Sequence, residues 1–348
     1  MSAQQFGFLK KHSTSHSVTC LYEKLIQNLE NKLDTAVLFV DLKAAFDTVD
    51  NEILLDKLDH YGIRHKTLKL LKSYLHNRKQ FVKCGSIEST VLSVLCGVPQ
   101  GSVLGPLLFI LYINDIFNCS SFDPVLYADD AALVISAKTL KKLNQNMNKE
   151  SKLFFEWLNA NKLTLNYKKT KYMIVTNKCY TPKFLKKFRL NINKNNIKQV
   201  EIFKYLGIIL DNNLSWKPHI DYLQSKLSSA AGILFKIRTY MPTHVLRLVY
   251  NSLVDSYLRY GIASWGTAAA YLNDRLQASQ NRVLKSLLPN NIAVSGFDPH
   301  YKHLKILTIE NLFRMNIGKF MHSIYHGYNP PAFDSSFPLC SHSYSIRR

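Results

Sequence analysis

The residue pair most suited to chemistry in this sequence is Asp129-Asp130. It lies between two apolar runs, residues 125–126 and 131–135, and this pattern predicts a strand, a tight turn and a second strand. Two adjacent carboxylates at a hairpin tip repel each other, and a hard divalent cation such as Mg²⁺ relieves this because it prefers carboxylate oxygen ligands. The pair therefore indicates a metal site. An ordinary polar turn is the alternative, because aspartate is common in turns.

A third carboxylate, Asp41, follows the continuous apolar run of residues 36–40, which is typical of a strand buried on both faces. If this strand neighbours the hairpin strands, three carboxylates meet at one edge of a sheet. A two-metal site needs such a set, because one ion activates a hydroxyl nucleophile and the other stabilises a leaving pyrophosphate. Taken alone, Asp41 is better explained as a strand-end residue that caps the next turn.

The charge balance points to an anionic partner. Of the 348 residues, 45 are Lys or Arg and 24 are Asp or Glu, which leaves a net charge of +21. Such a surplus makes the compact state repel itself unless nucleic acid or an anionic membrane surface offsets it. No segment reaches the roughly 18 uninterrupted apolar residues that a membrane span needs, so we expect no membrane insertion.

The cysteine pattern and the N-terminus favour an intracellular protein, in the nucleus or the cytoplasm. The six cysteines include no Cys-x-x-Cys pair, which argues against structural zinc and against a disulfide scaffold. Residues 1–5 lack an apolar signal region, so we expect no secretion.

The elements that must position the carboxylates are a mixture of helices and short strands. Asp50 is a candidate N-cap for a helix at 51–60. Residues 183–198 are rich in Lys and Asn and are expected to form a solvated loop. We expect helices at 18–31, 66–76 and 140–161, strands at 81–83, 90–92, 172–176 and 203–210, and a mainly helical region from residue 219 onward.

Five segments, in order, resemble the core motifs of reverse transcriptases, and the closest resemblance is to non-LTR (LINE-type, jockey-like) retrotransposons. Together they cover residues 36–210, and weaker similarity extends to residues 5–8 and 260–266. The segments are FVDLKAAFD at 39–47, GVPQGSVLGPLLF at 97–109, YADD at 127–130, NYKKTK at 166–171 and FKYLG at 203–207.

The resemblance implies an RNA-directed DNA polymerase that transfers nucleotides to a primer 3′-hydroxyl with two Mg²⁺ ions, or with Mn²⁺. Asp41, Asp129 and Asp130 would be the catalytic metal ligands, with Asp41 and Asp129 bridging. The partners would be an RNA template, a DNA primer and deoxynucleoside triphosphates. The lysines at 140–161 and 183–198 would contact template–primer phosphates, so binding would depend on salt.

The resemblance also implies a set of substrate-binding residues. Phe46 would exclude the 2′-hydroxyl of ribonucleotides, although a plain core aromatic explains it too. Gln100 and Gly101 would line the nucleotide pocket, although a helix-entry turn explains them equally. Tyr127 would contact the substrate. Lys169 would lie near the triphosphate, but a solvated basic face is as good an explanation for any lysine of this segment.

The implied fold is a right-hand polymerase with an α+β palm built on an antiparallel sheet, a helical thumb and largely missing fingers. Residues 1–35 would be a fingers remnant, 36–210 the palm, and 211–348 the thumb and C-terminal region. Leu9 departs from the family, which has a basic residue at this position. We also recognise no endonuclease domain, ribonuclease H domain or Cys/His knuckle, so the chain resembles a fragment of a longer polyprotein.

Two other interpretations stay open. In the first, the chain is a catalytically inactive remnant that still binds nucleic acid. In the second, it is a different two-metal enzyme, such as an RNA polymerase or an intron-type maturase. Phe46 favours deoxynucleotides, which argues against an RNA polymerase, and the segment GVPQGSVLGP fits the retrotransposon type better.

Overall fold

The computed structural model describes residues 1–180, 188–288 and 297–334. The chain divides into two compact units. Unit 1 comprises Met1–Ser17 and Lys24–Val200, and unit 2 comprises Val18–Glu23 and Glu201–Arg348. All the residues predicted to do chemistry lie in unit 1, so its sheet is the element that positions them.

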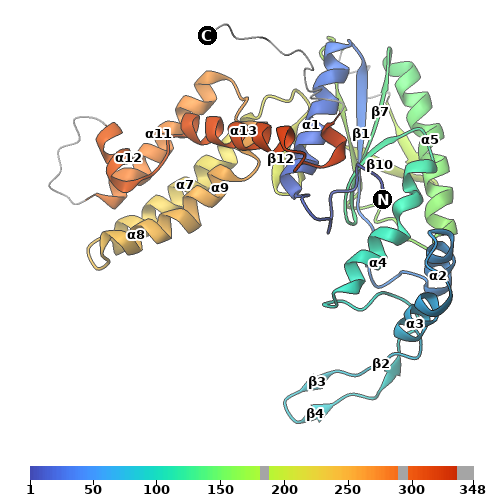
Figure 1. Ribbon diagram of the computed structural model, residues 1–348. Helices are drawn as coiled ribbons and strands as arrows, with labels where there is room; N and C mark the ends of the chain where they lie inside the picture. Colours follow the sequence, from blue (N-terminus) through green and yellow to red (C-terminus); the bar gives the residue numbers. More distant parts are fainter. Residues whose placement is uncertain (181–187, 289–296, 335–348) are drawn as a thin grey trace, which may run out of the picture. The chain divides into compact units, whose positions relative to one another are not determined.

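Unit 1 is built on a six-stranded sheet with the order β6-β7-β1-β8-β10-β9 (Figure 1). The central strand β1 is buried along its whole length, as the continuous apolar run predicts. The strands are β1 (Asp34–Val40), β6 (Asp123–Tyr127), β7 (Asp130–Ala137), β8 (Lys171–Val175), β9 (Leu190–Ile192) and β10 (Asn195–Gln199).

The sheet is mixed, whereas we expected it to be antiparallel. Strand β1 pairs antiparallel with β7 on one side and with β8 on the other, but β10 pairs parallel with β8. The parallel pair arises because β9 and β10 form a hairpin at the edge, and β10, the second strand of that hairpin, is the one that docks on β8.

The prediction of a solvated loop at 183–198 was wrong for its described part. Residues 181–187 lie outside the described residues, but the following residues form β9 and β10. Leu190, Ile192 and Ile197 are almost fully buried. A few apolar side chains on one face of each strand are enough to place this polar segment at the sheet edge.

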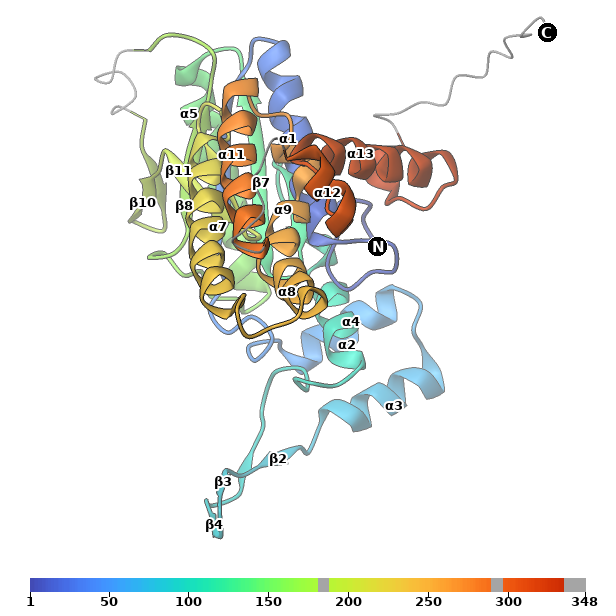
Figure 2. The same cartoon turned by 90° about the vertical axis from the view of Figure 1, so that its left-hand side faces the viewer.

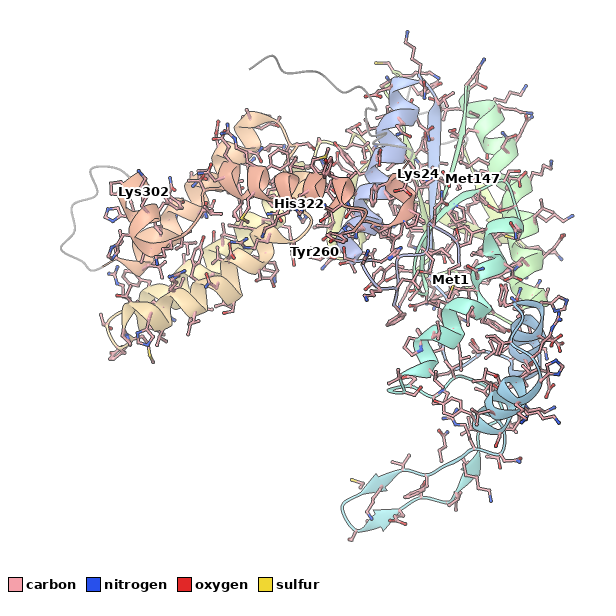
Figure 3. The ribbon with its side chains drawn as sticks, viewed as in Figure 1. Met1, Lys24, Met147, Tyr260, Lys302 and His322 are labelled. Atoms are coloured by element: carbon pink, nitrogen blue, oxygen red, sulfur yellow. The ribbon has the colours of Figure 1, made fainter. Side chains whose placement is uncertain are left out.

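Helices flank the sheet of unit 1. Asp50 caps α2 through hydrogen bonds from the Glu52 and Ile53 amides, as predicted. Helix α5 lies along one side of the sheet (Figure 1), and Met147 on it is fully buried (Figure 3). The helices are α1 (Thr14–Glu30, of which Val18–Glu23 belong to unit 2), α2 (Asn51–His60), α3 (His65–Leu75), α4 (Leu104–Tyr112), the 3₁₀ turn η1 (Asn114–Asn118) and α5 (Leu140–Ala160).

An exposed arm made of two successive pairs of short strands follows α3 in the chain (Figures 1 and 2). Its outer pair is β3 with β4 and its inner pair is β2 with β5, and all four strands are exposed. The arm consists of β2 (Lys79–Gln80), β3 (Lys83–Cys84), β4 (Ile87–Glu88) and β5 (Leu92–Ser93).

Unit 2 combines one β-hairpin with a helical bundle in which α7 packs along α11 (Figure 2). Trp216, Tyr250 and Trp265 are buried in it. Tyr260, which is labelled in Figure 3, donates a hydrogen bond to the Leu206 carbonyl. The described part of the chain contains no helix with the length and apolar character needed to cross a bilayer. The elements are β11 (Ile202–Tyr205), β12 (Ile208–Asp211), α7 (Lys217–Ile237), α8 (Thr243–Tyr250), the π-helical η2 (Asn251–Asp255), α9 (Ser256–Arg259), α10 (Ile262–Trp265), α11 (Ala270–Leu287), α12 (Asp298–Leu304), α13 (Ile309–Tyr325) and η3 (Pro331–Phe333).

Candidate active site at the end of the central strands

The Asp129-Asp130 pair lies on the turn of a two-stranded hairpin, as the sequence predicts. Strands β6 and β7 pair antiparallel, and Tyr127 opposite Asp130 closes the ladder. Ala128 and Asp129 form the two-residue turn, and Ala128 has a φ of 54°. A positive φ at the first central residue matches the twist of the flanking strands, although it strains an alanine.

The strand register brings Asp41 to the same end of the sheet. Val40 pairs with Ala131, so the next residue along β1 comes level with Asp130. The expectation that the strand before Asp41 neighbours the hairpin is confirmed. Asp41 and the acidic pair, which are far apart in sequence, thus share one end of the sheet.

Burial and neighbouring charge raise the pKa values of the two carboxyls on the turn. Burial raises the pKa of Asp129, and the charge of Asp41 adds to this, although a backbone hydrogen bond opposes it. Burial, then Asp129 and then Asp41 raise the pKa of Asp130 to about 6. Asp130 is exposed as a residue, and the solvent that reaches it screens part of the repulsion. The set therefore favours either a proton or a cation.

The carboxylates share the strand end without converging on one point. Within residues 1–180, 188–288 and 297–334, no three acidic, histidine or cysteine side chains form a preformed metal cage. Like charges disfavour such convergence. The chemistry of the donor set nevertheless fits a hard divalent cation, because all three ligands are carboxylates and two have raised pKa values.

A loop after α5 wraps the backbone of Asp41. The Asp41 amide donates to the Thr170 hydroxyl at 3.2 Å, and the Asp41 carbonyl accepts from the Asn166 amide at 2.8 Å. Lys169 lies on this loop with its Nζ atom 3.9 Å from Asp41 Oδ1, and it is exposed. The structure thus places Lys169 beside a predicted metal ligand. Sequence reasoning missed Thr170, whose only signal is its place inside the fourth motif.

Phe46 belongs to an aromatic stack in the segment that follows Asp41. Its ring lies 4.2 Å from the buried Phe109 ring at 25°, and Phe8 meets it edge-on at 6.2 Å. Phe46 itself is half-buried. It is thus both a packed aromatic and a surface that a ligand can reach, which accommodates both sequence interpretations.

The second motif is bonded to the end of the first. The Val98 amide donates to the Phe46 carbonyl at 3.0 Å, and Gln100 Nε2 donates to Asp47 Oδ1 at 2.6 Å. Gly101 has a φ of 77°, and a Cβ atom built there would meet nothing within 4 Å. Sequence reasoning assigned no role to Asp47, although it lies inside the quoted first motif.

Tyr127 is half-buried at the end of β6, opposite Asp130. The structure therefore gathers Asp41, Asp129, Asp130, Tyr127 and Lys169 at one strand end. Phe46 lies on the loop that continues from Asp41, and Gln100 and Gly101 lie on the loop that leads into α4. The hydrogen bond between Gln100 and Asp47 joins these two loops.

The sequence also matches a known protein family. Residues 1–210 match the reverse transcriptase (RNA-dependent DNA polymerase) family, and the chain belongs to that family.

The relatives are polymerases of non-LTR, jockey-like retrotransposons. The chain is 30% identical over 326 residues to the probable RNA-directed DNA polymerase from transposon BS of Drosophila melanogaster, covering 88% of this chain and 34% of that protein. It is 28% identical over 321 residues to the X-element protein of the same species, covering 88% and 34%. It is 26% identical over 298 residues to the jockey polymerase of Drosophila funebris, covering 81% and 31%. The chain thus spans 34% or less of these curated relatives.

Among solved structures, apo telomerase from Candida tropicalis is similar with a TM-score of 0.43 and 11% identity, covering 94% of this chain and 57% of that chain.

Proposed function

We propose that this chain is the polymerase core of a non-LTR retrotransposon protein and extends a DNA primer on an RNA template. The observation that carries the proposal is the strand register that brings Asp41 level with Asp130, beside Asp129, at one end of the sheet. The family match and the jockey-like relatives support it.

We infer that Asp41, Asp129 and Asp130 hold two divalent cations, Mg²⁺ or Mn²⁺. When bound, these ions supply the charge that activates the primer 3′-hydroxyl and stabilises the leaving pyrophosphate. The protein's own contribution is the fixed end of the sheet. The strand pairing fixes the turn, and the Thr170 hydroxyl fixes the backbone of Asp41. The three carboxylates therefore need little rearrangement of the backbone to bind the ions.

The surrounding residues fit the parts of a nucleotide site. Phe46 would lie under the sugar and exclude a 2′-hydroxyl, and its stacking on Phe109 would keep the ring from moving aside. Gln100 and Gly101 would line the nucleotide pocket, with Gly101 allowing close backbone approach. The exposed Lys169 would neutralise triphosphate charge, and Tyr127 would contact the substrate.

In this proposal, residues 36–210 are the palm, 211–348 are the thumb and C-terminal region, and 1–35 belong to the fingers. The net charge of +21 supports binding to template and primer phosphates. The protein would work inside the cell, where deoxynucleoside triphosphates and RNA templates are present.

Primer extension tests the site. Purified chain, a DNA primer on an RNA template and Mg²⁺ should give extension. The Asp129→Asn variant should lose at least about a hundredfold, because several kcal/mol of charge stabilisation disappears. Asp56→Asn, on an exposed position of α2, is the matched control and should extend as the wild type does. Extension by Asp129→Asn at the wild-type rate contradicts the site assignment.

A second candidate function is nucleic-acid binding without catalysis. It is favoured by the net charge of +21, which supports binding to nucleic-acid phosphates whether or not the carboxylates hold metal ions. A wild-type chain that binds template–primer in a gel-shift assay but adds no nucleotide, with Mg²⁺ or Mn²⁺, would establish it. Measurable extension would exclude it. Comparing ribonucleotide with deoxynucleotide addition separates a reverse transcriptase from an RNA polymerase.

A further inference from the structure

The N-terminal segment of unit 1 runs beside the hairpin that carries Asp129 and Asp130. The Phe6 amide donates to the Leu126 carbonyl at 2.8 Å, and the Leu126 amide donates to the Gln4 carbonyl at 3.0 Å. Gln5 therefore forms a parallel bridge with Leu126. The segment covers the outer edge of β6, the edge strand of the sheet, and so reaches the base of the turn.

The side chain of Gln5 bonds the turn itself. Gln5 is 1% exposed, and its Oε1 atom accepts from the Ala128 amide at 3.1 Å and from the Gly7 amide at 2.8 Å. The ladder closes at Tyr127 and Asp130, so the buried Ala128 amide needs a partner from elsewhere. Gln5 is the partner that the structure supplies.

Gly7 lets the segment approach the turn closely enough for this bond. A Cβ atom at position 7 would lie 2.3 Å from the Ala128 nitrogen and 3.0 Å from its Cα atom. Backbone on both sides leaves no flexible side chain that could move away. An alanine at this position would therefore push the segment and the turn apart.

The orientation of the Gln5 amide is set by its two donors. Because two backbone N–H groups point at one atom, that atom must be the oxygen. The Nε2 atom is then buried without a hydrogen-bond partner among the described residues, which is unfavourable. A side chain at this position that cannot accept would leave two backbone amides unbonded, which is a larger loss.

We propose that Gln5 is a positioning residue for the candidate metal-binding turn. Its carbonyl oxygen, with Gly7 as the close-approach point, holds Ala128 in its positive-φ conformation and thereby sets where Asp129 and Asp130 point. The role of these aspartates as metal ligands rests on the proposed function. The hydrogen bond from the Ala128 amide to Gln5 is independent of that function.

Amide hydrogen exchange at Ala128 tests the hold without any need for activity. Gln5→Met keeps the length and volume of the side chain but cannot accept the bonds. We expect the Ala128 amide to exchange at least about tenfold faster in this variant, while strand amides such as that of Leu133 keep their protection. Gln5→Glu restores an acceptor at the same reach and should return Ala128 to slow exchange. Unchanged exchange in Gln5→Met overturns the proposal.

Mn²⁺ titration followed by electron paramagnetic resonance tests the consequence for the aspartates. We expect Gln5→Met and Gly7→Ala to weaken Mn²⁺ binding by about tenfold, since displaced ligands lose coordination energy. Gly318→Ala is the control, because a Cβ atom there meets nothing within 4 Å. Faster exchange at Ala128 with wild-type Mn²⁺ affinity overturns the positioning role.

The outcomes separate the two proposals. If the wild-type chain adds no nucleotide, the proposed function fails, but the exchange and Mn²⁺ measurements still decide the role of Gln5. If the chain is active, we expect Gln5→Met to lower kcat by about tenfold with little change in KM for the deoxynucleotide, because displaced metal ligands weaken stabilisation of the transition state more than binding of the nucleotide. A tenfold rise in KM with unchanged kcat contradicts the positioning role of Gln5.

Discussion

Replacing Asp130 by asparagine should stabilise the folded chain at neutral pH. The pKa of Asp130 is raised from 3.8 to about 6 by burial, by Asp129 and by Asp41. A carboxyl whose pKa is higher in the folded state than in the unfolded state favours folding fully at low pH. That contribution is lost as the pH rises through the folded-state pKa. Asparagine keeps the shape and removes the charge, so the variant escapes this loss.

The size of the effect follows from the pKa shift after a correction for solvent. A shift from 3.8 to about 6 corresponds to a loss of about 3 kcal/mol in the free energy of unfolding for a fully buried carboxyl. Asp130 is exposed, so solvent screening reduces the expected gain in Asp130→Asn to about 1 kcal/mol at about pH 7.5. At about pH 4 most of the gain should be lost, because the carboxyl is then protonated in the folded chain and partly protonated in the unfolded chain.

Urea unfolding of the wild type and of Asp130→Asn at about pH 4, 5, 6 and 7.5 measures this difference directly. Asp56→Asn serves as the control, because this exposed aspartate on α2 lies outside the three-carboxylate set. A second series with added Mg²⁺ should stabilise the wild type more than the variant, since a ligand that binds only the folded state stabilises it by mass action.

Two results would refute this reasoning. One is an Asp130→Asn variant that is no more stable than the wild type at about pH 7.5. The other is a gain of the same size at both ends of the pH range, because a charge effect must vanish when the carboxyl is protonated.

Three further predictions concern the nucleotide site. Phe46→Val should raise the kcat/KM for ribonucleotides relative to deoxynucleotides by about tenfold or more in single-nucleotide extension, and an unchanged ratio contradicts the sugar-exclusion role. Gly97→Ala should lower Tm, because the φ of Gly97 is 90° and a Cβ atom would lie 2.8 Å from the Asp47 carbonyl oxygen; an unaltered Tm would show that the loop relaxes freely. Lys169→Gln should raise KM for the deoxynucleotide about tenfold with Tm unchanged, and equal KM values would leave Lys169 as a solvated lysine.

Much of unit 1 could be predicted from sequence because its signals are local. The continuous apolar run before Asp41 forms β1, Asp50 caps α2 where expected, and the acidic pair lies on a tight turn. Each of these features depends on side chains within a few residues of one another. Apolar periodicity and capping chemistry therefore report them directly.

Contacts between distant segments escaped the same reasoning. The short strands β9 and β10 form in a stretch whose composition predicts a solvated loop, because partners elsewhere in the sheet bury its few apolar side chains. Likewise, no local pattern predicts that Gln100 bonds Asp47 or that Gln5 bonds Ala128. Such contacts depend on how the chain folds back on itself.

The three aspartates show both contributions. The sequence by itself determined that acidic residues follow one buried strand and lie on the turn of a hairpin, and the order of its motifs determined the family. Only the tertiary structure decided that the central strand pairs with the hairpin in the register that sets Asp41 level with Asp130. It also decided that the carboxylates share this strand end without closing into a cage. The reason is that strand identity follows from local side-chain pattern, whereas register and the distances between like charges follow from pairing and packing across the whole sheet.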